Sequence, residues 1–204
     1  MIQSKIKVLF SDLGGVLLTN GWDRHSRAKA IALFKLEEKE FESRHQLLFG
    51  DYETGKISLE TYLRYAVFYK PCSFSYEQFV EFMYAQSQSF PDMIELIKRL
   101  KNEHGLKVAF ISNEGRELTD YRIKTFKLDE IADFFIVSCF LGIRKPDKRV
   151  WEMALDLMQV APDQAVYIDD RQLFVEIAQN MGIHSLCHKE YAATSAALKE
   201  HFNN

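Results

Sequence analysis

Apolar residues along this chain follow two different patterns, and the change between them divides the sequence. Residues 20–89 carry apolar positions at helical spacing, broken by short polar stretches, and no run in this segment predicts a strand. The helices predicted there span 24–34, 37–49, 58–68 and 75–86. Their aromatic side chains recur at the same spacing, so they are better explained as the core of a helical bundle than as a cage for a ligand.

The rest of the chain alternates short apolar runs with amphipathic helical patterns. Strands are predicted at 8–10, 106–111, 134–138, 165–168 and 183–186, with helices between them, including 91–104, 117–126 and 146–158. A strand, a helical insertion and then alternating helices and strands predict an α/β fold with a doubly wound parallel sheet of about five strands. We expect residues 1–19 and 90–204 to form this core and residues 20–89 to form an inserted helical bundle.

Composition and charge narrow the possible partners. The 204 residues are 47% hydrophobic and 27% charged, a globular mixture, with a formal net charge of -3 and no block of lysine and arginine. A nucleic-acid-binding surface is therefore not expected. No apolar run approaches the ~20 residues of a membrane span, and the N-terminal residues enter the first strand without a signal-peptide pattern. We expect a cytoplasmic protein without a membrane partner, either monomeric or dimeric.

The cysteines predict neither a disulfide framework nor a zinc site. Cys72, Cys139 and Cys187 are odd in number, far apart and without C-x-x-C spacing. Each is expected to be a small buried apolar residue.

Polar side chains follow three of the predicted strands at their carboxyl ends. Asp12 follows the first strand, Ser112 and Asn113 the second, and Asp169 and Asp170 the fourth. Each of these groups alone has an ordinary explanation as a turn or a helix cap. The carboxyl ends of parallel strands share one edge of the sheet, however, so their joint occurrence predicts that these side chains converge in one crevice.

Lys145 adds a cation to this crevice. It precedes Pro146 at the predicted start of a helix, where a Lys-Pro pair taken alone would be a solvated helix terminus. Clustered carboxylates repel one another unless a cation offsets the repulsion, and such oxygen ligands suit Mg²⁺. A hydroxyl, an amide and an ammonium group suit the oxygens of a phosphoryl group.

The motifs resemble those of the haloacid dehalogenase superfamily with a helical C1-type cap. They are D-L-G-G-V near the start, I-S-N-E in the middle, then G-I-R-K-P and Y-I-D-D, and together they cover nearly the whole chain. The chain is similar in particular to small sugar-phosphate phosphatases of the alpha-D-glucose-1-phosphate phosphatase type, which have D-L-G-[NG]-V and a G-x-[IL]-[ST] stretch in the cap, here G-K-I-S at 55–58. The resemblance implies a Rossmann-like core with residues 20–89 as the cap.

The resemblance also implies roles at the phosphoryl group. Asp12 would be the nucleophile that forms an aspartyl-phosphate. Ser112 and Asn113 would hold the phosphoryl group during transfer, and Lys145 would neutralise charge on it and on Asp12.

A Mg²⁺ ion is implied in the same way. Asp12, the backbone carbonyl of Gly14, and Asp170 would be its protein ligands, with support from Asp169. The implied substrate is a small phosphorylated metabolite.

Two departures from the family pattern bear on activity. Phosphatases of the superfamily have a second aspartate two residues after the nucleophile, where this chain has Gly14. That aspartate transfers protons, and such a group is worth ~10²–10⁴-fold in rate. Asp23 or His25, on the linker into the cap, are candidates to replace it when the cap closes. The second departure is the bulky Phe174 after the acidic pair, where support for the metal would be expected.

Three function classes stay open on the sequence. The favoured one is a Mg²⁺-dependent phosphatase. A 2-haloacid dehalogenase would explain Gly14, because a departing halide needs no proton, but that branch typically lacks the acidic pair Asp169-Asp170. The third is a weakly active or non-catalytic binding protein that keeps the fold.

Overall fold

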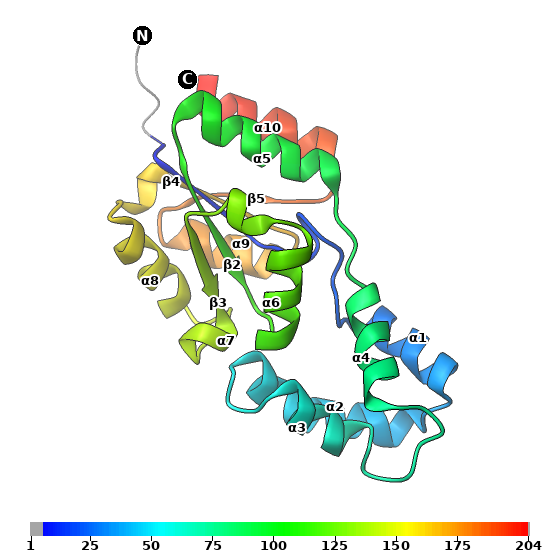
Figure 1. The fold of residues 1–204 in the computed structure, drawn as a ribbon. Coiled ribbons are helices and arrows are strands. Elements are labelled where there is room, and N and C mark those ends of the chain that lie inside the picture. The colour runs from blue at the N-terminus through cyan, green and yellow to red at the C-terminus, as the bar shows by residue number, and fades with distance from the viewer. Residues whose placement is uncertain (1–5, 204) are drawn as a thin grey trace.

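A five-stranded sheet lies at the centre of the protein, which a computed structural model describes over residues 6–203 (Figure 1). All neighbouring strands pair in parallel, in the order β3-β2-β1-β4-β5. The strands are β1 (Val8–Ser11), β2 (Lys107–Ser112), β3 (Phe134–Val137), β4 (Ala165–Asp169) and β5 (His184–Cys187). The predicted α/β fold with its five parallel strands is confirmed.

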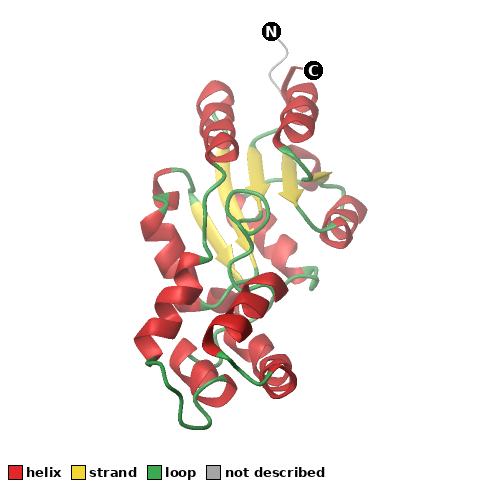
Figure 2. Ribbon diagram, turned by 90° about the vertical axis from the view of Figure 1, so that its right-hand side faces the viewer, coloured by secondary structure: helices red, strands yellow, loops and turns green. Residues whose placement is uncertain are grey.

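Helices cover both faces of the sheet, as Figure 2 shows. They are α5 (Pro91–His104), α6 (Arg116–Thr125), α7 (Ser138–Leu141), α8 (Arg149–Met158), α9 (Gln172–Asn180) and α10 (Tyr191–Asn203), with single 3-10 turns η1 (Leu128–Glu130) and η2 (Pro162–Gln164). Side chains alternate along β1: Leu9 packs with α5 and α10 on one face, whereas Val8 and Phe10 pack with α8 and α9 on the other. Burial on both faces explains why β1 reads as an unbroken apolar run.

Four further helices gather beyond one end of the sheet (Figure 1). They are α1 (Arg24–Phe34), α2 (Glu38–Glu53), α3 (Leu59–Ala66) and α4 (Tyr76–Ala85). Ser58 and Ser75 cap the last two through bonds from Thr61 N and Gln78 N, as serine at a helix start favours. Trp22, Phe41 and other aromatic residues form a separate apolar core among these helices. We propose that residues 20–89 constitute a cap over a core of residues 1–19 and 90–204, of which 1–5 and 204 lie outside the described residues.

The two connections between the sheet and the four helices run side by side. Thr19 N donates to the carbonyl of Gln88 (2.8 Å), and an isolated bridge pairs Leu18 with Ser89. Arg122 of α6 fastens both connections, because its Nη2 donates to the Thr19 carbonyl (2.9 Å) and its Nε to Ser87 Oγ (2.9 Å). The orientation of the helices over the sheet is thus held by a buried side chain of the core.

Two expectations about local structure are wrong. The predicted helix at 146–158 begins only at Arg149, and Lys145 and Pro146 lie in the preceding loop with a cis peptide bond between them. The side chain of Asn113 holds the backbone of Lys145 there, a long-range contact that the local pattern could not indicate. All three cysteines are free as expected, but only Cys139 is buried, because Cys72 lies in a surface loop and Cys187 ends the edge strand β5.

Within residues 6–203, no helix combines the length and the apolar composition that a membrane span requires.

Candidate active site

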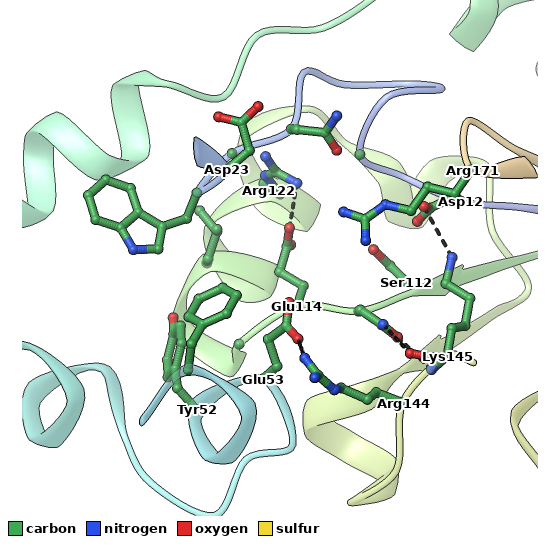
Figure 3. A pocket seen from close by; sticks show the side chains of 18 of the residues that line it. Asp12, Asp23, Tyr52, Glu53, Ser112, Glu114, Arg122, Arg144, Lys145 and Arg171 are labelled. Carbon is green, nitrogen blue, oxygen red and sulfur yellow. Dashed lines mark hydrogen bonds and ion pairs between the residues drawn. The ribbon is translucent and has the colours of Figure 1, made fainter. Parts of the chain in front are cut away.

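A cavity of about 430 Å³ opens where the carboxyl ends of β1, β2 and β4 meet. Asp12, Ser112 and Lys145 line it from the core. Trp22 and Tyr52 line it from the side of the four helices, as the close view in Figure 3 shows for Tyr52. The polar strand ends predicted to converge therefore do so, and the cavity has walls from both parts of the chain.

Lys145 is the central cation of this cavity. It is only 2% exposed, and its Nζ lies 2.6 Å from Asp169 Oδ2 and 3.1 Å from Asp12 Oδ2. The ammonium group also donates to the carbonyl of Ile111 (2.9 Å). The ring of Phe174 covers it, with the ring centroid 5.1 Å from Nζ. Phe174 therefore packs over the lysine, which accounts for a bulky residue at this position.

Asp12 is held so that one oxygen faces the lysine. Its Oδ1 accepts from the backbone N–H of Leu13 (2.7 Å), and its Oδ2 is the oxygen near Lys145. Burial raises the pKa of Asp12 to about 6; Lys145 opposes this rise, and the negative charges of Asp169 and Asp170 add to it. Lys145 alone does not offset the crowding of carboxylates, so a further cation would stabilise the ionised form of Asp12.

The carboxylates fit a divalent metal ion. Among the described residues, Asp12, Asp169 and Asp170 bring oxygen atoms within 4.8 Å of one another. Asp170 Oδ1 is buried and has no hydrogen-bond partner among residues 6–203. Burial raises the pKa of Asp170, and the neighbouring Asp169 raises it further. A buried, unpaired carboxylate oxygen beside two other acids is the donor set that Mg²⁺ prefers.

The two aspartates at the carboxyl end of β4 differ in how many hydrogen bonds their side chains accept. Asp169 Oδ2 accepts from Lys145 and from the hydroxyl of Tyr167, and its Oδ1 accepts from Arg171 N (2.8 Å). Among residues 6–203, Asp170 Oδ2 has only a long contact from Asn20 Nδ2 (3.4 Å). Asp170 is therefore the less engaged of the two carboxylates, and Asp169 is the more fully bonded one.

Glycines bring the backbone close to this acidic cluster. Gly15 has a φ of 76°, and a Cβ there would lie 2.3 Å from Asp170 Oδ2. Only glycine fits that position without displacing the carboxylate. Gly14 lines the cavity, and a Cβ on it would lie 2.8 Å from Asn20 Oδ1, at the end of a side chain that can move.

Ser112 and Asn113 contribute to the site in different ways. Ser112 is 5% exposed and lines the cavity at the end of β2. The amide of Asn113 is committed to the backbone of Lys145: Nδ2 donates to its carbonyl (2.8 Å), and Oδ1 accepts from its N–H (2.9 Å). The side chain of Asn113 thus positions Lys145, while Ser112 lines the cavity.

The two candidates for a proton-transfer group on the linker are placed differently. Asp23 lines the cavity, but its Oδ1 accepts from Ser26 N (2.8 Å) as the N-cap of α1. His25 is exposed and is not among the residues that line the cavity. The geometry favours Asp23 over His25, although a capping carboxylate is already occupied.

Two ion pairs that the sequence did not indicate complete the wall (Figure 3). Glu114, in the I-S-N-E motif, pairs with Arg122 of α6, and both side chains are buried. Glu53 of α2 pairs with Arg144, which precedes Lys145 in the G-I-R-K-P motif. The second pair joins α2 to the loop before α8 directly beside the cavity. The motifs contained one member of each pair, but not its partner.

Known proteins resemble this chain in sequence. A family model described as haloacid dehalogenase-like hydrolase matches residues 6–182. The chain is 32% identical over 85 residues to (S)-2-haloacid dehalogenase 4A of Burkholderia cepacia, and 28% identical over 116 residues to glyceraldehyde 3-phosphate phosphatase of Pyrococcus furiosus. These matches cover 42% and 54% of this chain but only 36% and 47% of the relatives, so the chain spans less than half the length of either.

Solved structures share the fold. A HAD family enzyme from Bacteroides thetaiotaomicron, in complex with magnesium and inorganic phosphate, superposes with a TM-score of 0.75. The match covers 90% of this chain and 94% of that one at 23% identity, a level at which the likeness concerns the fold.

Proposed function

The chain belongs to the haloacid dehalogenase-like hydrolases, and on this premise we propose that it is a Mg²⁺-dependent phosphatase of small phosphorylated metabolites. The observation that carries the proposal is the buried cluster in which Lys145 bridges Asp12 and Asp169 while Asp170 keeps an unpartnered oxygen. Support comes from the structural neighbour bound to magnesium and inorganic phosphate and from the relative named glyceraldehyde 3-phosphate phosphatase.

The residues of the chain divide the reaction between them. Asp12 attacks the phosphorus atom, and its bond to phosphorus forms as the bond to the leaving oxygen breaks, which yields an aspartyl-phosphate. Ser112 donates a hydrogen bond to a phosphoryl oxygen, and Lys145 balances charge on the phosphoryl group and on Asp12. Water then attacks the phosphorus atom, releasing inorganic phosphate and restoring the Asp12 carboxylate.

A bound Mg²⁺ would be held by Asp12, Asp170 and the Gly14 carbonyl, with Asp169 in support. It would supply the positive charge that offsets the mutual repulsion of the acids and the charge of the phosphoryl group. The burial of Asp12 and Asp170 strengthens this effect, because charges interact more strongly away from water.

A second candidate is 2-haloacid hydrolysis. Gly14 favours it, because a halide leaves without a proton, and a dehalogenase is among the relatives. The acidic pair after β4 favours the phosphatase instead, since a metal-independent reaction has no use for the unpartnered oxygen of Asp170. A weakly active binding protein of the same fold is the third possibility.

One assay separates the three. Phosphate release from a panel of sugar and aryl phosphates, and chloride release from 2-chloropropionate, are measured with Mg²⁺ and again with a chelator. We expect phosphate release that the chelator abolishes. Chloride release unaffected by the chelator would select the dehalogenase, and no product from any compound would select the binding protein.

Mg²⁺ is expected to stabilise the fold. A ligand that binds only the native state at 100 times its Kd stabilises by about 2.7 kcal/mol, which raises the melting temperature of a chain of this size by roughly 5–10 °C. Differential scanning fluorimetry with and without Mg²⁺ measures the shift. Asp170→Asn is the control and should lose it. An unchanged melting temperature at saturating Mg²⁺, together with full activity in chelator, contradicts the metal site.

A further inference from the structure

The cavity lacks the proton-transfer group that a phosphatase of this kind needs, because position 14 is a glycine. Apart from Asp12, the carboxylates that line the cavity are Asp23, Glu53 and Glu114. Asp23 caps α1, and Glu53 pairs with Arg144 across the boundary between cap and core. Glu114 has a different environment from both.

One carboxylate oxygen of Glu114 is held in an ion pair, and the other has no hydrogen-bond partner among residues 6–203. Oε1 pairs with Nη1 of Arg122, whose other two nitrogens donate to Ser87 Oγ and the Thr19 carbonyl, and these bonds fix the orientation of the guanidinium group. Oε2 is buried and has no hydrogen-bond partner among the described residues. A buried polar atom without a partner destabilises the fold, and this cost disappears when the atom carries a proton that it donates to a bound ligand.

The charges around Glu114 suit proton exchange near neutral pH. Burial raises its pKa to about 7, while the Arg122 guanidinium opposes the rise. The negative charges of Asp12 and Glu53 raise the pKa further, and the hydroxyl of Thr119 lowers it. Tyr52, which faces Glu114 from α2, stays uncharged because burial raises its own pKa well above its usual value. An acid with a pKa near the working pH is the efficient choice for general acid-base catalysis.

Glu114 lines the same cavity as Asp12 and Ser112. It follows Ser112 and Asn113 directly in the chain, and its backbone N–H is fixed by Ser138 Oγ (2.9 Å). In Figure 3 its carboxylate lies between Arg122 and Glu53, across the cavity from Lys145. The part of a substrate beyond the phosphoryl group would extend from Asp12 toward this wall and the cap.

We propose that Glu114 is the catalytic acid and base of this enzyme, in place of the missing aspartate at position 14. As the Asp12 oxygen bonds to phosphorus and the phosphorus–oxygen bond to the leaving group breaks, protonated Glu114 gives its proton to the leaving oxygen. The resulting carboxylate then takes a proton from the water that attacks phosphorus, and phosphate departs as Asp12 is restored. The proposal rests on the phosphatase function proposed above.

The test compares leaving groups in matched variants. Glu114→Gln keeps the shape and an oxygen for Arg122 but cannot supply the proton. We expect its kcat/KM, which covers the steps up to formation of the aspartyl-phosphate, to fall about 10²-fold or more for a sugar phosphate with a primary alcohol as the leaving group. The loss for p-nitrophenyl phosphate, whose leaving group needs no proton, should stay below about tenfold. Activity on the aryl ester also shows that the variant is folded.

Two control variants test the other carboxylates that line the cavity, Glu53 and Asp23. Glu53→Gln removes a carboxylate that is paired across the domain boundary, so it should affect both substrates to the same degree. Asp23→Ala tests the linker acid in the same way. Equal losses of kcat/KM for both substrates in Glu114→Gln, or a larger leaving-group dependence of kcat/KM in Asp23→Ala, would overturn the assignment to Glu114.

A pH profile gives an independent readout. For the sugar phosphate, kcat/KM of the wild type should fall as the pH rises through about 7, because Glu114 must be protonated for the first step. This basic limb should be absent for p-nitrophenyl phosphate and absent in Glu114→Gln. If Glu114→Gln does not fold, Glu114→Asp serves instead, with a smaller loss on the sugar phosphate and the basic limb retained. A basic limb that persists in Glu114→Gln contradicts the proposal.

Failure of this proposal is distinct from failure of the proposed function. If wild-type protein releases phosphate from neither substrate with Mg²⁺, the phosphatase function itself is wrong. If the wild type hydrolyses both and Glu114→Gln does not discriminate between them, only the role of Glu114 is wrong.

Discussion

Replacing Asp12 with asparagine is expected to abolish phosphate release while leaving the fold intact. The amide has the same shape and can still accept from the N–H of Leu13 (2.7 Å in the wild type), but it cannot form the bond to phosphorus. Loss of a nucleophile that acts together with its neighbours removes most of the catalysis, so we expect kcat to fall by more than about 10³-fold. Steady-state phosphate release measures the effect, and a circular dichroism melt shows that the variant is folded.

The matched control is Asp23→Asn, which also replaces one carboxylate of the cavity wall with an amide. An asparagine remains a good N-cap for α1, so this variant should fold and retain activity on an aryl phosphate. Residual activity of Asp12→Asn above a tenth of the wild type would contradict the role of Asp12 as a nucleophile.

Lys145→Met is expected to damage both stability and activity. The lysine is 2% exposed and bridges Asp12 and Asp169, so its removal leaves two buried carboxylates without their cation. Breaking a buried ion pair in this way costs about 3–5 kcal/mol. Activity should fall to background, because charge on the phosphoryl group and on Asp12 is no longer balanced. Urea unfolding measures the free energy change, and phosphate release measures the activity.

Lys148→Met is the control for this prediction. Lys148 is exposed and forms only a surface pair with Glu152 on α8 (3.3 Å), a type of contact worth about 0–1 kcal/mol. It should therefore change neither stability nor activity by much. If Lys145→Met is as stable as Lys148→Met, Lys145 does not hold the carboxylates together.

The architecture of the core could be predicted from local patterns. The unbroken apolar run at Val8 to Phe10 indicated a strand covered on both faces, and it is the central strand of the sheet. The polar residues at the strand ends could be predicted to share one edge of the sheet, because the strands are parallel. The order of the strands and the pairing of the two connections at Thr19 and Gln88 were not predictable, because they depend on contacts between segments far apart in the sequence.

The site could be predicted only where its residues lie in motifs at strand ends. Pro146 was misplaced at a helix start, since proline is equally favourable in the first turn of a helix and in a loop. What decides between them here is Asn113, more than thirty residues away, which binds the backbone of Lys145.

The buried environment of Glu114 could not be predicted from the sequence either. In the sequence it is one acid after Ser112 and Asn113, and Arg122 looks like an ordinary polar residue of a helix. Both are buried only because the connections at Thr19 and Ser87 close over the arginine. Burial of a charged pair by distant segments leaves no periodic signal, although it produces the unpartnered oxygen on which the proposed acid-base role depends.

The central claim is that Asp12 carries the phosphoryl group during turnover. Wild-type enzyme is mixed with Mg²⁺ and p-nitrophenyl phosphate, quenched rapidly in acid during turnover, digested and analysed by mass spectrometry. Our account predicts a phosphoryl adduct on the peptide that contains Asp12, absent when substrate is omitted. Mg²⁺-dependent phosphate release with the adduct on a different residue, or with no adduct on any peptide at any quench time, would contradict it.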